Sequence, residues 1–230
     1  MFGAAALPRC LLIFAALTWS GLAVAQTPAM QMFDPPGGKG RGVLVVSGQS
    51  GPKNYAAVAK QIADLGFNVA LIDGNDVFKK DNAGLPAFNA AVAALEASPK
   101  TTPGKIAAVG FSLGGGAVLT YATRAPDRFA TVIAYYPFTA FIQNPDTFAG
   151  QIKVPTLILA ATKDTYKDCC KIDTARKLAD AGKKASPPVL ELVEYPQADH
   201  AFILPGPQLR AGDTADALKR ATAHLRAGLK

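Results

Sequence analysis

One serine of the chain stands within a cluster of glycines. The stretch Gly110-Phe111-Ser112-Leu113-Gly114 fits the pattern G-x-S-x-G, and two more glycines follow it. In a nucleophile elbow, this pattern puts the serine on a strained turn between a strand and a helix, where the glycines let the two elements pass closely. A glycine inside a helix costs up to about 1 kcal/mol relative to alanine, so the cluster indicates a place that cannot accommodate bulk. The pattern predicts Ser112 as a nucleophile.

A serine nucleophile needs a base that removes its proton, and the chain has two histidines. His200 lies in YPQADHAFILPG, which we expect to be a loop between the last strand and the closing helix. His224 lies in a helical pattern among basic neighbours, where we expect a solvated surface histidine. We therefore predict His200 as the general base.

The imidazole in turn needs a carboxylate that fixes its tautomer and stabilises its charged form. Asp164 comes just beyond the buried strand predicted in VPTLILAAT. With this acid, the chain order is serine, acid, histidine, an order known from one large class of hydrolases. Asp168 lies four residues further into the same loop and remains the alternative acid.

Backbone N–H groups must stabilise the negative charge that develops on the attacked carbonyl oxygen. The first should be the N–H of Leu113, directly after the serine. The second should come from the loop after the first buried strand, SGQSGPKNY, where Gln49 is our choice and Gly48 the alternative. The other interpretation of this loop is that its glycines only form a turn.

The elements that would position these residues alternate along the chain. Strands are predicted at 42–47, 67–73, 105–111, 130–137, 154–162 and 189–195. Helices are predicted at 54–66, 85–98, 113–124, 173–182 and 208–230. The strands are apolar throughout, which indicates burial on both faces and therefore an α/β fold with a mostly parallel sheet and helices on each side. Ligands bind such sheets at the carboxyl ends of the strands, where the candidate residues lie.

The segment from Phe138 to Gly150 leaves the predicted sheet and is too short for a large lid. Its aromatic side chains either line a pocket for an acyl group or pack a loop.

The composition and net charge limit the class of protein to which the chain can belong. The chain has 230 residues, 50% of them hydrophobic and 18% charged, which is typical of a single globular domain. The formal net charge is +7, but the basic residues are scattered and the densest pairs are Lys79-Lys80 and Lys183-Lys184. We therefore do not expect nucleic acid as a partner.

The first 25 residues have the pattern of a targeting segment. A weakly basic start precedes the apolar stretch CLLIFAALTWSGLAVA, and Ala23-Val24-Ala25 matches the small-x-small cleavage pattern before Gln26. We expect a cleaved signal peptide at 1–25, an extended lead-in rich in proline and glycine at 26–42, and a single domain at 43–230. The protein would then be secreted or periplasmic and not bound to the membrane after cleavage; an uncleaved anchor is the alternative.

Removal of this segment would leave two adjacent cysteines, Cys169 and Cys170. In an oxidising compartment they could pair with each other or across a dimer. We expect no metal, because the chain has no second cysteine pair and only two histidines. A serine, a histidine and a carboxylate require no cofactor for their chemistry, so we expect none.

Four segments carry a resemblance to a known family: GVLVVSGQSG, GFSLGGG, ATKD and ADHAF. With their spacing, the sequence resembles the dienelactone hydrolase family of the α/β-hydrolase fold over nearly the whole chain after residue 25. The resemblance implies a single-domain hydrolase with little or no lid that acts on esters or lactones. Family members typically carry a cysteine in the elbow, whereas this chain has Ser112.

These inferences give one leading hypothesis and two alternatives. The leading hypothesis is a serine hydrolase that cleaves small-molecule carboxylic esters or lactones through Ser112, Asp164 and His200, with an acyl-enzyme intermediate. The first alternative is an amidase or short-peptide hydrolase with the same triad. The second is a non-catalytic binding protein on a hydrolase scaffold. The sequence leaves the oligomeric state open.

Overall fold

The centre of the molecule is a seven-stranded sheet with strand order β1-β3-β2-β4-β5-β6-β7. The computed structural model describes Met1 and residues 27–184 and 189–230. The strands are β1 (Met30–Phe33), β2 (Gly40–Val46), β3 (Asn68–Ile72), β4 (Thr101–Phe111), β5 (Phe129–Tyr135), β6 (Thr156–Ala161) and β7 (Leu190–Tyr195). Every neighbouring pair is parallel except β1 with β3. The predicted, mostly parallel sheet is confirmed.

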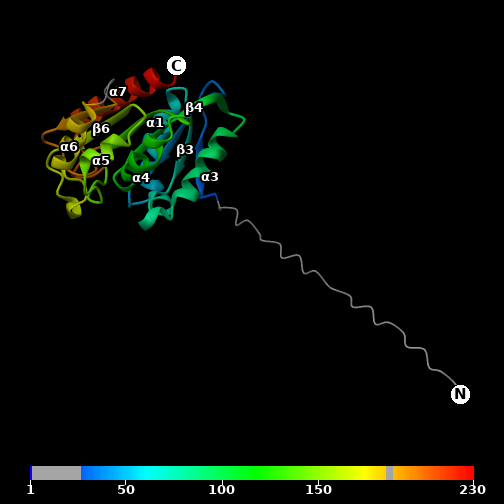
Figure 1. The fold of residues 1–230 in the computed structure, drawn as a ribbon. Helices are drawn as coiled ribbons and strands as arrows, with labels where there is room; N and C mark the ends of the chain where they lie inside the picture. The colour runs from blue at the N-terminus through cyan, green and yellow to red at the C-terminus, as the bar shows by residue number, and fades with distance from the viewer. Residues whose placement is uncertain (2–26, 185–188) are drawn as a thin grey trace.

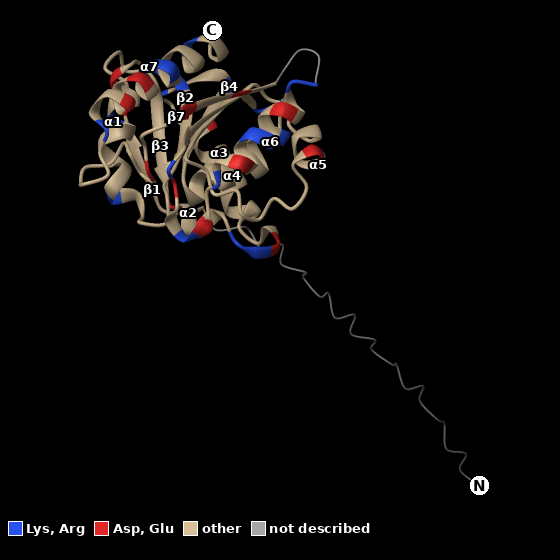
Figure 2. Cartoon of the chain, turned by 90° about the vertical axis from the view of Figure 1, so that its left-hand side faces the viewer, with Lys and Arg blue, Asp and Glu red and all other residues tan. Residues whose placement is uncertain are grey.

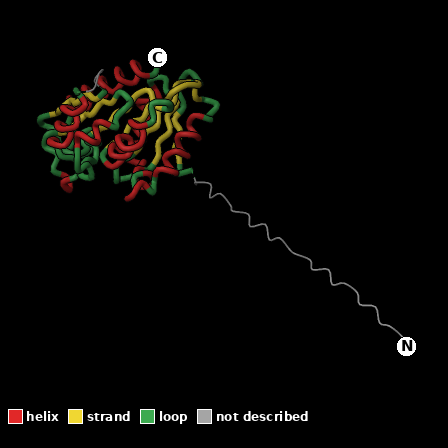
Figure 3. Tube along the Cα trace, in the orientation of Figure 1, coloured by secondary structure: helices red, strands yellow, loops and turns green. Residues whose placement is uncertain are grey.

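Helices cover both faces of this sheet, as Figures 1 and 3 show. The longer helices are α1 (Ala56–Asp64), α3 (Leu85–Glu96), α4 (Leu113–Tyr121), α6 (Ile172–Gly182) and α7 (Ala211–Gly228). Successive strand residues point to opposite faces. In β2, Leu44 and Val46 accordingly belong to a core shared with α3, α4 and α6, whereas Val43 and Val45 belong to a core shared with α1 and α7. Because the strands are buried on both faces, apolar and polar residues do not alternate along them.

Several short elements complete the chain. They are α2 (Gly74–Val77), α5 (Pro145–Gly150) and the 3₁₀ turns Pro52–Tyr55, Lys80–Asn82, Ala122–Arg124 and Tyr166–Asp168. The pattern of the sequence did not indicate β1, α2 or α5. β1 lies inside the segment 26–42, where we expected an extended lead-in, and pairs antiparallel with β3. A strand of four residues, all of them at least partly exposed, is too short to show a period.

The segment between β5 and β6 adds only α5 and its loops, so the molecule has little or no lid. Its aromatic rings pack together around Phe78, whose ring centroid lies 5.9 Å from that of Phe138 and 5.2 Å from that of Phe141. The three rings also line a cavity of about 350 Å³ that Leu113 adjoins. We expected these aromatic side chains either to line a pocket or to pack a loop, and they do both.

Lysine, arginine, aspartate and glutamate residues are interspersed over the helices visible in Figure 2. The expected signal peptide lies outside the described residues. Within the residues that are described, no helix is long and apolar enough to cross a lipid bilayer.

Candidate active site

Ser112 forms the turn between β4 and α4. Its backbone has φ 50° and ψ −113°, in the region that disfavours residues other than glycine. Such a conformation costs on the order of 1–3 kcal/mol and persists only where the surroundings enforce it. They do so here, because the Ser112 N–H donates to the Tyr135 carbonyl at 3.0 Å and the Ser112 carbonyl accepts from the N–H of Phe138 at 2.8 Å. The strained elbow predicted from the sequence is present.

The glycines around Ser112 are explained by how closely α4 crosses the sheet. A Cβ atom at Gly114 would overlap the backbone carbonyl oxygens of Val46 and Ser47, and one at Gly110 would overlap the carbonyl of Gly114. A Cβ atom at Gly115 would lie 2.8 Å from the Cα atom of Pro137. Each clash is with backbone, which cannot rotate away as a flexible side chain can.

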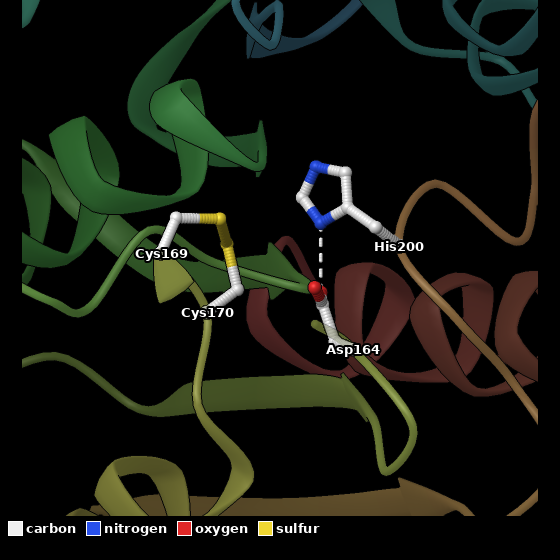
Figure 4. Close-up of side chains that lie close together, drawn as sticks. All are labelled: Asp164, Cys169, Cys170 and His200. Atoms are coloured by element: carbon white, nitrogen blue, oxygen red, sulfur yellow. Dashed lines mark hydrogen bonds and ion pairs between the residues drawn. A yellow bond between two sulfur atoms is a disulfide. The ribbon is translucent and has the colours of Figure 1, made fainter. Parts of the chain in front are cut away.

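His200 and Asp164 form a hydrogen-bonded pair at the same edge of the sheet (Figure 4). Asp164 follows β6 and His200 follows β7. The Nδ1 atom of the imidazole lies 2.7 Å from Oδ2 of Asp164, whose side chain is 1% exposed. The other carboxylate oxygen accepts from the N–H of Tyr166 at 3.1 Å. A carboxylate held at Nδ1 favours the tautomer that leaves Nε2 free to accept a proton.

The alternative acid does not reach the imidazole. The side chain of Asp168 is 86% exposed and lies 3.5 Å from the ammonium group of Lys171. Of the two candidate acids, the fold brings Asp164 to His200.

Ser112 and His200 line one cavity of about 490 Å³, together with Gln49, Tyr55 and Tyr166. Within the described part of the chain, no hydrogen bond joins the Ser112 hydroxyl to the His200 ring. Catalytic hydrogen bonds in unliganded enzymes are often long and tighten only with substrate. The arrangement therefore holds the two side chains in a common cavity without yet linking them.

The loop after β2 lies against the elbow. A Cβ atom at Gly48 would be 3.2 Å from the Cβ atom of Ser112, and Gln49 lines the shared cavity. Leu113 is the first residue of α4. Over residues 27–184 and 189–230, the backbone N–H groups of Gln49 and Leu113 find no acceptor. Neither N–H group therefore has a competing partner in this part of the chain, and the role of the two as oxyanion donors stays a prediction.

Two tyrosines contact the imidazole and were not identified from the sequence. The ring of Tyr166 stacks on that of His200, with centroids 4.5 Å apart and an angle of 13° between the planes. The ring of Tyr136 meets His200 edge-on at 5.1 Å. Burial raises the pKa of Tyr136 well above its ordinary value, so its hydroxyl stays protonated. The sequence positions of both tyrosines could have identified them as site residues, because Tyr136 directly follows β5 and Tyr166 lies two residues after Asp164.

A polar contact links the acid-bearing loop to the loop after β2. The ammonium group of Lys167 lies 3.3 Å from Oε1 of Gln49 and 5.1 Å from the centroid of the Tyr166 ring. Lys167 has φ 48°, a further strained position close to the cavity.

The remaining residues singled out in the sequence lie as follows. Cys169 and Cys170 form a disulfide with each other, the first of the two pairings considered, and lie beside Asp164 and His200 (Figure 4). His224 lies on α7 and lines a separate cavity between α6 and β7. The expectation that His224 is solvated is wrong: it is partly buried, and burial lowers its pKa.

Known proteins resemble this chain in sequence. Residues 74–228 match the model of the dienelactone hydrolase family. Cutinase 2 of Thermobifida cellulosilytica is 29% identical over 130 residues, covering 54% of this chain and 47% of the cutinase. Lipase 1 of Moraxella sp. (strain TA144) is 29% identical over 119 residues, covering 50% of this chain and 35% of the lipase. The chain spans less than half the length of these curated relatives.

Solved structures share the fold. A dienelactone hydrolase-like promiscuous phosphotriesterase from metagenomic libraries superimposes with a TM-score of 0.73 at 20% identity, covering 87% of this chain and 92% of that one. Est1E from Butyrivibrio proteoclasticus gives a TM-score of 0.66 at 16% identity, with coverages of 86% and 94%. The sheet order, the serine elbow and the family match over residues 74–228 lead to one conclusion: this chain has the α/β-hydrolase fold and belongs to the dienelactone hydrolase family.

Proposed function

We propose that this protein is a serine hydrolase that cleaves carboxylic esters or lactones. The observation that carries the proposal is the pair His200–Asp164, hydrogen-bonded at 2.7 Å beside a cavity that Ser112 also lines. Membership of the dienelactone hydrolase family supports it, as do the matches to a cutinase and a lipase.

In the proposed mechanism, the Ser112 hydroxyl turns toward His200, and Nε2 takes its proton as the oxygen attacks the carbonyl carbon. Asp164 keeps the imidazole in the required tautomer and stabilises the imidazolium that forms. The N–H groups of Leu113 and Gln49 donate to the oxyanion of the tetrahedral intermediate. His200 then protonates the leaving alcohol, and a water molecule hydrolyses the acyl-enzyme by the same steps in reverse.

The two cavities beside the elbow suggest how an ester would lie. The leaving alcohol must be near the imidazole that protonates it, so it would occupy the cavity lined by His200 and Tyr166. The acyl group would then point the other way, past Leu113, into the cavity lined by the rings of Phe78, Phe138 and Phe141. With little lid above the site, we propose small, soluble esters or lactones as substrates rather than long lipids.

A panel of esters tests this proposal with the chain starting at Gln26. Short acyl esters of nitrophenol, aliphatic esters and small lactones should be hydrolysed, and Ser112→Ala should abolish turnover. His224→Ala provides the control, because that histidine lies at a different cavity. A folded chain that hydrolyses none of these compounds would favour the binding-protein alternative, and one that cleaves only anilides or short peptides would favour the amidase.

We also propose that residues 1–25 are a cleaved signal peptide, so that the enzyme acts in the periplasm or outside the cell. N-terminal sequencing of the protein from the periplasmic fraction should find Gln26 first. A protein that retains Met1 and sediments with membranes would replace cleavage with anchoring.

A further inference from the structure

The disulfide Cys169–Cys170 lies against the His200–Asp164 pair, as Figure 4 shows. One ligand-type atom from each of these four residues lies within 4.8 Å of each of the others. Both cysteines are buried, with exposed fractions of 8% and 7%. The Cys169 carbonyl accepts from the N–H groups of Thr139 at 2.8 Å and Ala140 at 3.0 Å, which fixes the cysteine segment in this position.

These residue types are those that bind zinc. Two thiolates, an imidazole and a carboxylate make a four-ligand set of the kind that holds Zn²⁺ tetrahedrally. A disulfide offers no thiolate, so the set is incomplete while the cysteines are joined. We propose that reduction of the Cys169–Cys170 disulfide creates a site for a zinc-like divalent cation, formed by Cys169, Cys170, His200 and Asp164.

This proposal departs from the expectation of no metal drawn from the sequence. That expectation counted cysteine pairs and histidines, and the chain has too few of either for a familiar spacing. The fold supplies the two missing ligands: Asp164 lies on the same loop as the cysteines, and His200 reaches them because β7 ends next to β6. Ligands drawn from the two loops that follow β6 and β7 form no familiar zinc-binding spacing in the sequence.

The required shifts are small. Ligand atoms about 2.0–2.3 Å from a tetrahedral Zn²⁺ are roughly 3.3–3.8 Å from one another. The present separations are all within 4.8 Å, so the longest would have to shorten by about 1.0–1.5 Å, and the two sulfurs, bonded to each other in the disulfide, would have to move apart to about 3.8 Å. The four ligand-bearing residues lie outside the strands and the long helices, on the segments after β6 and β7, which can adjust without moving the sheet.

Charge explains why a cation would be held there. Two thiolates beside the buried Asp164 carboxylate would place three negative charges in a site largely removed from water, which is strongly unfavourable without a counter-charge. A dication that replaces the two thiol protons supplies that counter-charge. Metal binding and deprotonation are thus one event.

The redox step balances with a phosphine as the reductant. The phosphine and one water molecule convert the disulfide to two thiols: phosphorus is oxidised to the phosphine oxide, the water oxygen goes to phosphorus, and its two protons go to the two sulfurs. Zn²⁺ then displaces the two thiol protons to solvent. No electron is left over in either step.

A cation at this position would stop the proposed hydrolase. An imidazole bound to a metal cannot take the Ser112 proton, and a carboxylate bound to the metal no longer orients the ring. This consequence rests on the proposed function, whereas the binding of metal does not. The two can therefore be tested separately.

The binding test uses Co²⁺ with the chain starting at Gln26, reduced with the phosphine. We expect one Co²⁺ per chain and the strong near-ultraviolet absorption of cobalt bound to thiolate. The oxidised chain and Cys169→Ala/Cys170→Ala should both lack that absorption. Alkylation of the reduced thiols with iodoacetamide provides a second control that does not depend on how the variant folds. Equal cobalt binding by the alkylated chain, or none by the reduced chain, would overturn the proposal.

The activity test uses Zn²⁺ at about ten times its dissociation constant, where roughly nine-tenths of the sites are filled. Ester turnover by the reduced chain should then fall by roughly tenfold and return when a chelator is added. The ratio of rates with and without Zn²⁺ should stay near one in the oxidised chain and in Cys169→Ala/Cys170→Ala. Equal inhibition of the oxidised chain would show that the cysteines are not needed. A chain without ester turnover would contradict the proposed function, and the cobalt test would still decide the metal site.

Discussion

The Nδ1 atom of His200 lies 2.7 Å from the Oδ2 atom of Asp164, a residue 36 positions earlier in the chain. Parallel strands β6 and β7 are neighbours in the sheet, so the loops that follow them begin side by side. The buried carboxylate has the imidazole as its side-chain partner, while Asp168 in the same loop faces solvent. This relationship is the structural basis of the acid and base assignments.

The first prediction separates the two acids. Asp164→Asn should lower kcat of ester hydrolysis by about 10³–10⁴-fold, because an amide cannot stabilise the imidazolium and favours the wrong tautomer. Asp168→Asn is the matched control in the same loop and should leave the rate nearly unchanged, since that side chain is 86% exposed. Steady-state kinetics of the two variants measure both values of kcat. A small loss of kcat in Asp164→Asn together with a large loss in Asp168→Asn would reverse the assignment of the acid.

The second prediction concerns Tyr166, which we regard as a positioning residue for His200. An aromatic stack of this kind contributes about 0.5–1.5 kcal/mol, so Tyr166→Ala should lower kcat/KM by roughly two- to tenfold. Tyr166→Phe keeps the ring and should restore the rate. An equal loss in both variants would instead assign the effect to the hydroxyl group.

The third prediction tests the glycine cluster through stability. Gly114→Ala should destabilise the fold by roughly 1–3 kcal/mol or more, because its Cβ atom would overlap the carbonyl oxygens of Val46 and Ser47. Gly212→Ala in α7 is the control: its Cβ atom meets nothing within 4 Å, and alanine suits a helix better by up to about 1 kcal/mol. Urea unfolding of both variants measures the difference. Equal stabilities would show that α4 does not cross the sheet as closely as described.

The fourth prediction follows from the partly buried His224. Burial lowers its pKa in the folded chain, so below its usual value of about 6.5 the unfolded chain binds more protons than the folded one. The stability that neutral His224 contributes is complete above about pH 6.5 and declines as the pH falls through the lower pKa of the folded state. His224→Gln should therefore lose less unfolding free energy than the parent chain between about pH 8 and about pH 5. Urea titrations at these two pH values give the comparison, and identical losses would contradict it.

The sequence predicted the layers of the fold well, for a physical reason. Strands such as β2 and β6 are buried on both faces, so their uninterrupted apolar runs stand out from the helical patterns around them. The short elements β1, α2 and α5 did not stand out, because four to six residues are too few to establish a period.

Some residues of the candidate site could likewise be predicted from the sequence, and others could not. Ser112 and its glycines were recognisable because the elbow needs adjacent residues in one order. Asp164 could be placed only by its position after a strand, and its hydrogen bond to His200 depends on β6 and β7 being neighbours. The stacking of Tyr166 and the contact of Cys169 and Cys170 with the acid–base pair arise from loop conformation, which leaves no spacing in the sequence.

The most direct test of the account is covalent labelling of the nucleophile. A fluorophosphonate reacts with a serine that a neighbouring base activates, and a cysteine pair joined as a disulfide offers no thiolate to iodoacetamide. We expect peptide mapping by mass spectrometry to find the fluorophosphonate on the peptide that contains Ser112, with loss of ester turnover in proportion. Ser112→Ala should take up no label, and iodoacetamide should leave the unreduced enzyme active. An enzyme that keeps its turnover after fluorophosphonate treatment, or that loses it to iodoacetamide instead, would contradict the serine mechanism.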